Sequence, residues 1–143
     1  ICHVTLTLHK VLESIGGRLW DASVLMAAWL GENRHRFQES IRILEIGAGL
    51  GVVGLAAGKI MPSAHILMTD YDPSVLDVLK TNIAANFGSG SCQLEVGVLD
   101  FRDFTPSSLA DVEAAKSQGS TVQGPLKRYA EANQLNSFDL ILA

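Results

Sequence analysis

Three alternating glycines, Gly47, Gly49 and Gly51, follow directly on an apolar stretch, residues 43–46. The apolar stretch predicts a short buried strand that carries one carboxylate. Glycine tolerates positive φ and lets a ligand approach bare backbone. Residues 52–57 resume an apolar pattern and predict a helix whose first N–H groups face the bend. A strand, a glycine-rich bend and a helix N-terminus together predict a site for a nucleotide-like cofactor.

The spacing of the glycines fits two classes of cofactor. Gly49, Gly51 and Gly54 satisfy the dinucleotide pattern G-x-G-x-x-G, which is a weak match by itself and would indicate an NAD-dependent oxidoreductase. The frame Glu45-x-Gly47-x-Gly49-x-Gly51 instead places the first glycine directly after the predicted strand, where the tight turn should fall. This frame resembles the first motif of the class I S-adenosylmethionine-dependent methyltransferases. A tight turn without any ligand is the third interpretation.

A carboxylate stands at the end of the next predicted strand, residues 64–70. Asp70 follows the first glycine of the bend by about 20 residues, the separation expected of an acid that binds a ribose. Its two oxygens can accept hydrogen bonds from two neighbouring hydroxyls. The alternative is that Asp70 and Asp72 are only turn and cap residues.

A third strand is predicted over residues 93–99, and Asp100 and Phe101 follow it. A carboxylate can accept a hydrogen bond from an adenine amine, and a ring can pack on the base. Taken alone, these two residues are a turn acid and a core ring. Trp20 precedes an apolar helix and is either a core anchor or an aromatic wall of the cofactor pocket.

Other elements are predicted from capping residues and apolar periodicity. Asp21 is a plausible N-cap of a helix that ends at Gly31. Asp72 and Pro73 begin a later helix that Gly88 ends. The apolar face of this later helix consists of Val75, Leu76, Leu79, Ile83 and Phe87. Asn82 and Asn86 are expected on the solvent side or near a cap.

The two ends of the chain and one long segment complete the pattern. Residues 4–8 alternate and predict an edge strand or an extended arm, and residues 138–143 predict a fourth strand. Residues 105–136 carry no chemistry that we can assign. Four strands, intervening helices and a glycine-rich first turn predict an α/β fold, a Rossmann-like, doubly wound parallel sheet of order 3-2-1-4 in a single domain.

Composition limits the classes of function. The sequence is 48% hydrophobic and 18% charged, which indicates a globular chain, and its net charge of −4 argues against a general nucleic-acid surface. Cys2 and Cys92 have no ligand-like spacing, so we expect reduced thiols and an intracellular protein. The histidines form no metal pattern, and no apolar run reaches the ~18 residues of a membrane span. No signal peptide is visible, although the chain begins at Ile1.

Together the motifs resemble the seven-β-strand methyltransferases, and most closely the family-16, or METTL21-like, protein-lysine methyltransferases. The matching segments are LWDAS (19–23), ILEIGAGLG (43–51), TDYD (69–72), LDF (99–101) and FDLILA (138–143). The glycine motif alone would indicate only the broad class. The Trp-Asp-Ala segment makes the resemblance to the lysine methyltransferases specific.

The resemblance implies that S-adenosyl-L-methionine is the cofactor. The residues implied to line its pocket are Trp20, Gly47, Ala48, Gly49, Asp70, Phe101 and Ala143. Asp70 would hold the ribose, Asp100 would reach the adenine amine, and Ala143 would lie beneath the cofactor. Phe101 stands where the family usually has Trp. Glu45 would orient the glycine bend rather than touch the cofactor.

The sequence departs from the family after its fourth strand. In the family, an Asp-x-x-Tyr-like segment and three further strands follow, so we expect a single domain over residues 1–143 that is incomplete at its C-terminus, and name no catalytic residue. The implied function is protein-lysine N-methylation; a non-catalytic or truncated binding module of the same fold and an NAD-dependent oxidoreductase are the alternatives. The implied partner is a protein lysine. We expect no nucleic-acid partner, no membrane contact and no metal. We expect the protein to act in the cytoplasm or also in the nucleus.

Overall fold

The computed structural model describes residues 3–10, 14–37, 40–88, 93–100 and 138–143. The chain divides into two units, and the second contributes only Asp100 to the described residues, so the fold is that of the first unit. Its elements are α1 (Asp21–Glu32), the 3-10 helix η1 (Arg34–Arg36), β1 (Arg42–Ile46), α2 (Val52–Ile60), β2 (His65–Asp70), α3 (Pro73–Phe87), β3 (Gln93–Val98) and β4 (Leu140–Leu142).

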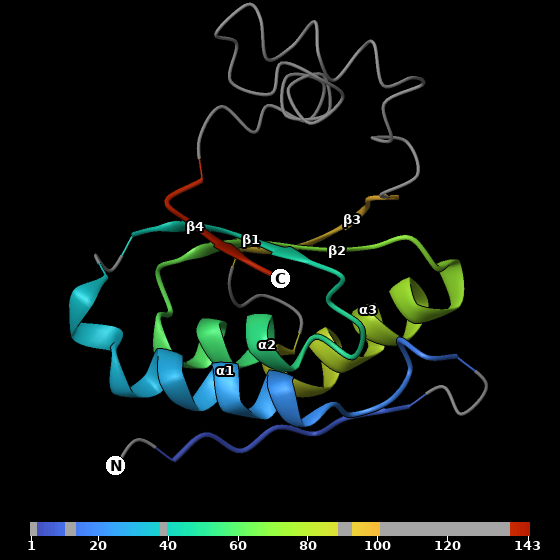
Figure 1. The fold of residues 1–143 in the computed structure, drawn as a ribbon, viewed down its shortest axis with the longest axis horizontal. Helices are drawn as coiled ribbons and strands as arrows, with labels where there is room; N and C mark the ends of the chain where they lie inside the picture. The colour runs from blue at the N-terminus through green and yellow to red at the C-terminus, as the bar shows by residue number, and fades with distance from the viewer. Residues whose placement is uncertain (1–2, 11–13, 38–39, 89–92, 101–137) are drawn as a thin grey trace, which may run out of the picture. The chain divides into compact units, whose positions relative to one another are not determined.

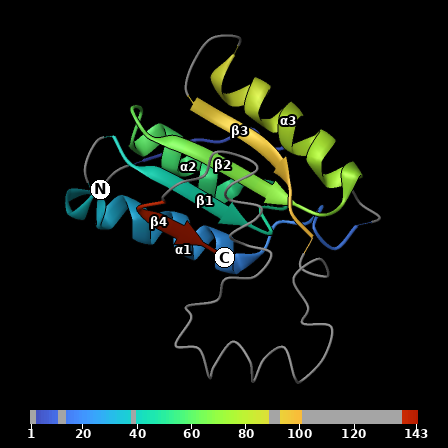
Figure 2. The same cartoon turned by 90° about the horizontal axis from the view of Figure 1, so that it is seen from above.

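The four strands form one parallel sheet in the order β3-β2-β1-β4, which confirms the predicted order 3-2-1-4. Helices α1, α2 and α3 all lie on one face of this sheet (Figures 1 and 2). Helices on the other face are not among the described residues, so the doubly wound arrangement stays a prediction. The carboxyl ends of β1 and β2 lie side by side, because Ile46 pairs with Thr69. The glycine bend therefore emerges beside Asp70.

The core lies between the sheet and α2. Every residue of α2 except Lys59 is buried, because the helix packs on the sheet, lies beside α1 (Figure 2), and belongs to a core against which Val4 and Leu6 of the N-terminal segment also pack. Ile43 and Ile66 are register partners on the helix-covered face and are almost fully buried. This apolar layer fixes the position of the bend that connects β1 to α2.

Two predictions about α1 are wrong. Its N-cap is Trp20 and not Asp21, and the Ser23 hydroxyl donates a hydrogen bond of 2.7 Å to the Trp20 carbonyl. Asp21 is the first helical residue, where its negative charge interacts favourably with the positive end of the helix dipole. The helix also continues through Gly31 to Glu32, and the N–H of Asn33 still donates to the Trp29 carbonyl at 2.9 Å. One glycine lowers helix stability without ending the helix.

A Gly31→Ala substitution is therefore expected to stabilise the chain by about 0.5–1 kcal/mol. A Cβ at this position would make ordinary contact with the Ile60 Cδ1 atom at 3.8 Å. Urea denaturation measures the gain. The matched control is Gly54→Ala in α2, where the Cβ would overlap the buried side chains of Glu45 and Met68 and stability should fall. A loss of stability in the Gly31 variant would contradict the prediction.

Helix α3 confirms its predicted ends and corrects its predicted polar face. The Asp72 carboxylate accepts the N–H of Ser74 at 2.9 Å as the N-cap, and Gly88 follows the last helical residue with φ +68°. Asn82, expected on the solvent side or near a cap, instead binds the backbone of the extended N-terminal arm, residues 3–10. Asn86 also binds this arm, and it lies near the C-cap, which is one of the two expectations for it. Asn82 is fully buried. The arm is extended but is not a strand of the sheet.

Candidate functional site

The bend between β1 and α2 has the backbone that its glycines predicted. Gly47, Gly49 and Gly51 have φ values of +66°, +54° and +78°, in the left-handed region that other residues rarely adopt. The N–H of Ala48 donates to the Thr69 carbonyl at 2.8 Å, which ties the bend to the tip of β2. The first N–H groups of α2 follow directly, and they have no carbonyl partner inside the helix.

Glu45 is a buried carboxyl group at this bend, with an exposed fraction of 4%. Its Oε2 accepts a hydrogen bond of 2.9 Å from the N–H of Gly54, in the first turn of α2. Burial raises the pKa of Glu45 to about 8; the Gly54 hydrogen bond opposes this shift, and the nearby charge of Asp70 adds to it. The bond joins β1 to α2 across the bend, which agrees with the expectation that Glu45 orients the bend.

Asp70 lies at the end of β2, and its carboxylate contacts the bend. Oδ2 accepts the N–H of Gly49 at 3.0 Å, and Oδ1 accepts the N–H groups of Tyr71 and Asp72 at 2.8 and 3.2 Å. A carboxylate offers about four acceptor positions. The three N–H groups leave roughly one acceptor position on Oδ2, but Asp70 is only 6% exposed, so a ribose hydroxyl would have to reach a largely covered carboxylate.

A cavity of about 240 Å³ opens beside the bend. Its lining comes from the segment before α1, the first turns of α1, the bend, the start of α2 and the end of β4, and includes Gly16, Arg18, Trp20, Met26, Glu45, Gly47, Ala48, Gly49, Leu142 and Ala143. Five of the seven predicted pocket residues share this cavity. Asp70 bonds to the bend but does not line the cavity, and Phe101 lies outside the described residues.

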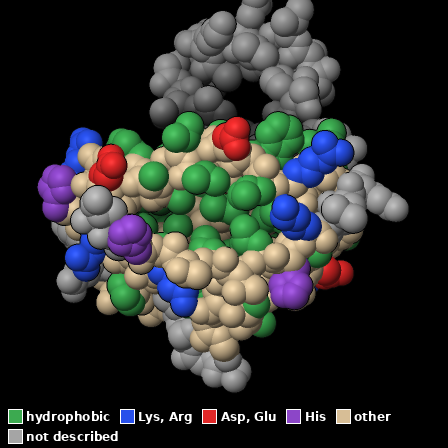
Figure 3. Space-filling model, turned by 90° about the horizontal axis from the view of Figure 1, so that it is seen from below, with side chains coloured by type: hydrophobic (Ala, Val, Ile, Leu, Met, Phe, Trp, Pro, Cys, Tyr) green, Lys and Arg blue, Asp and Glu red, His purple; other side chains and the backbone are tan. Residues whose placement is uncertain are grey.

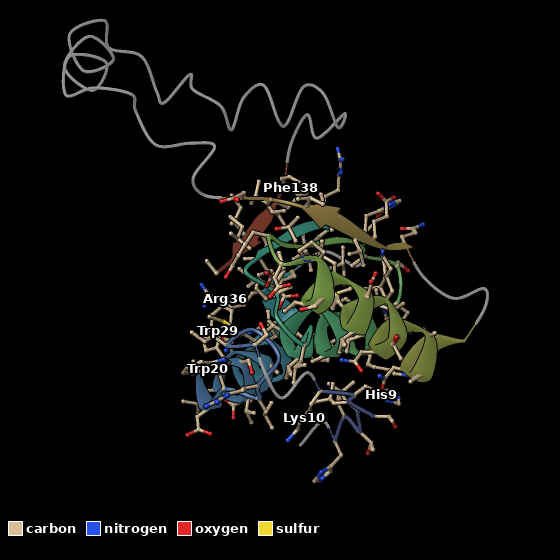
Figure 4. The ribbon with its side chains drawn as sticks, turned by 90° about the vertical axis from the view of Figure 1, so that its right-hand side faces the viewer. His9, Lys10, Trp20, Trp29, Arg36 and Phe138 are labelled. Carbon is tan, nitrogen blue, oxygen red and sulfur yellow. The ribbon has the colours of Figure 1, made fainter. Side chains whose placement is uncertain are left out.

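Trp20 is a wall of this cavity rather than a core anchor. Its side chain is 55% exposed, and its Nε1–H donates to the Ile15 carbonyl at 3.2 Å. Figure 4 shows Trp20 and Trp29 on the same side of the molecule, both on the α1 segment. Sequence reasoning missed Gly16 and Arg18 as lining residues. The only sequence signal for them is the glycine pair 16–17.

A second cavity, of about 760 Å³, lies between the N-terminal arm, α1 and α2. It shares Val52 with the first cavity, and its other lining residues are mostly apolar. Figure 3 views the molecule from the side of the arm and shows hydrophobic side chains gathered on this face. None of the predicted site residues lines this second cavity.

The family model described as lysine methyltransferase matches residues 3–115. The chain belongs to this family. Membership favours the glycine frame that begins at Gly47 over the dinucleotide frame that begins at Gly49. In the structure Gly54, the last glycine of the dinucleotide frame, lies inside α2, where it lets Glu45 and Met68 pack closely.

Known proteins of the family resemble the chain over part of their length. Mouse protein-lysine N-methyltransferase EEF2KMT is 32% identical over 104 residues, which are 66% of this chain and 31% of the mouse protein. Zebrafish protein N-lysine methyltransferase METTL21A is 32% identical over 93 residues, 60% of this chain and 41% of the relative. The chain thus spans less than half the length of either relative.

Among solved structures, a candidate RNA methyltransferase from Pyrococcus horikoshii superposes with a TM-score of 0.50. It is 18% identical to this chain, and the match covers 69% of this chain and 50% of that one. At this identity the likeness supports the fold alone, a methyltransferase-type parallel sheet.

The described residues fit the cofactor that the family implies. A Cβ added at Gly47 would meet no atom within 4 Å, so there is free space beside the bend for a ligand to approach the backbone. The cavity is smaller than the about 300–1,000 Å³ of most small-molecule sites. The described residues therefore make up part of such a site.

The described part of the chain contains neither a candidate metal site nor a helix that could span a membrane. It contains no group of three or more His, Cys, Asp or Glu side chains that could hold a metal ion. Within the same residues, no helix has the length and apolar character needed to span a membrane.

Proposed function

We propose that the chain carries the cofactor-binding part of an S-adenosylmethionine-dependent protein-lysine N-methyltransferase. The observation that carries the proposal is the cavity at the glycine bend of a chain that belongs to the lysine methyltransferase family. The relatives named above are protein-lysine N-methyltransferases, which supports a protein lysine as the substrate. We further propose that the protein acts in the cytoplasm or also the nucleus.

Five of the seven predicted pocket residues have a role in this proposal. Gly47, Ala48 and Gly49 would hold the methionine part of the cofactor through bare backbone. Asp70 would accept a ribose hydroxyl on its remaining acceptor position. Trp20 would close the cavity from the α1 side, as its place in the lining supports.

Methyl transfer would need little acid–base catalysis from the protein. When bound, S-adenosylmethionine supplies a methyl group already activated by its sulfonium, so the main requirement is alignment of a neutral lysine amine. The chain's residues would hold the cofactor still and keep water away from that methyl group. Part of the cavity lining is apolar, including Met26 and Leu142, and fits the second task.

Isothermal titration calorimetry with S-adenosylhomocysteine tests the cofactor. Binding at one site per chain is the expected result, and NADH should give no fluorescence enhancement. Folded protein that binds no S-adenosylhomocysteine would contradict the proposal, and NADH binding would support the oxidoreductase interpretation. A methyl-transfer assay on lysine-containing proteins then separates an enzyme from a binding module, because cofactor binding without transfer would favour the module.

A further inference from the structure

Asn82 in α3 joins two segments of the chain that lie far from it in sequence. Its Oδ1 accepts the N–H of His9 at 2.6 Å, and its Nδ2 donates to the His9 carbonyl at 3.2 Å. The same Nδ2 donates to the Leu50 carbonyl at 3.0 Å, inside the glycine bend. The side chain is fully buried, so one amide group connects the N-terminal arm to the bend.

Asn86, one helical turn later, makes the same pairing with the arm but has no contact with the bend. Its Oδ1 accepts the N–H of Thr7 at 2.8 Å, and its Nδ2 donates to the Thr7 carbonyl at 2.7 Å. Four helical residues rise about 6 Å and two extended residues about 6.6 Å, so alternate arm residues meet successive asparagines. Figure 4 places His9 on the arm beside α3.

The chain that continues from the arm also lies against the bend. Ser14 Oγ donates to the Asp72 carboxylate at 3.0 Å, beyond the tip of β2. A Cβ built on Gly49 would lie 2.8 Å from the Gly16 carbonyl oxygen, so Gly16 packs directly on the bend. The N-terminal segment thus meets the bend at Leu50 through Asn82 and at Gly49 through Gly16.

We propose that Asn82 is a positioning residue that couples docking of the arm to the conformation of the cofactor bend. Leu50 lies between two glycines of positive φ, in a bend whose Gly51 N–H already donates to the Ala48 carbonyl at 2.7 Å. The donor from Asn82 on the Leu50 carbonyl is a second hydrogen bond to the same peptide, between Leu50 and Gly51. If the arm leaves, Asn82 loses two of its three side-chain hydrogen bonds, and water that reaches the amide competes with the Leu50 carbonyl for its N–H groups.

This coupling must be reciprocal: a cofactor that orders the bend should also hold the arm in place. That consequence rests on the proposed function, whereas the link between the arm and the bend does not. The two parts can therefore be tested separately, the link in the cofactor-free chain and the consequence with S-adenosylhomocysteine.

The decisive variant is Asn82→Asp, which keeps an acceptor for the His9 N–H but removes both donors. Asn86→Ala is the matched control, since it removes an equivalent arm contact and leaves Leu50 untouched. Hydrogen exchange of the Gly49 and Gly51 amides in cofactor-free protein should be faster in the Asn82 variant and unchanged in the control. Affinity for S-adenosylhomocysteine should fall roughly three- to tenfold in the Asn82 variant and less than twofold in the control.

Equal effects of the two variants on the bend amides would show that Asn82 has only a general structural role and would overturn the proposal. If Asn82→Asp does not fold, His9→Pro removes the same arm N–H from an exposed position, and exchange at Gly49 and Gly51 should again be faster. Unchanged exchange in that variant would also overturn it. If the wild-type chain binds no S-adenosylhomocysteine, the proposed function fails, while the exchange experiment still decides the coupling.

Discussion

A Gly47→Ala substitution is expected to weaken S-adenosylhomocysteine binding roughly 10- to 100-fold while lowering stability by only about 1 kcal/mol. Gly47 has a φ of +66°, and a Cβ there would meet no atom within 4 Å. The protein without cofactor would therefore bear only the cost of a left-handed alanine. The bound cofactor would meet a methyl group in the free space beside the bend. Calorimetric titration gives the affinity and urea denaturation gives the stability.

Gly88 provides a matched control for this substitution. It has a φ of +68°, and a Cβ there would also meet no atom within 4 Å. It follows the end of α3 and does not line the cavity. Gly88→Ala should therefore lose at least as much stability but keep the wild-type affinity. If both variants bound S-adenosylhomocysteine equally well, the cofactor would not lie against Gly47.

The fold could be predicted wherever the signals are local. Asp72, Pro73 and Gly88 give the ends of α3 because capping and φ preference act within a few residues. The interior glycine of α1 was misjudged, because whether Gly31 ends a helix depends on the hydrogen bonds that later residues still make. The asparagines of α3 could not be placed, since Asn82 binds the backbone of His9, 73 residues away.

The candidate site shows the same division. The conformation of Gly47, Gly49 and Gly51 could be predicted because it lies in one short segment with a strand before it and a helix after it. The bond from Gly49 to Asp70 depends on the register between β1 and β2, which no spacing in the sequence specifies. Gly16 was not predicted as a lining residue, because its position depends on how the N-terminal segment packs over the bend.

The free energy of unfolding is expected to fall as the pH rises from about 5 to about 8, and a Glu45→Gln substitution should remove this component. The carboxyl has an ordinary pKa of 4.5 and one of about 8 in the folded chain. Between these values the folded chain holds a proton that the unfolded chain has lost. Stability then decreases by about 1.4 kcal/mol per pH unit. The contribution is complete below pH 4.5 and is lost above pH 8.

Urea denaturation of cofactor-free protein at several pH values between 5 and 8 measures this component as the difference between wild type and Glu45→Gln. Glutamine keeps an oxygen to accept the Gly54 N–H, so the bend should remain intact while the titration disappears. The control Glu95→Gln removes a carboxyl from an exposed position on β3, away from the bend, and should leave the component assigned to Glu45 in place. If the free energy of unfolding differed between wild type and Glu45→Gln by the same amount at every pH, Glu45 would be ionised in the folded chain. Its bond to Gly54 would then be a charge-assisted one, and the buried charge would need a further partner at the bend.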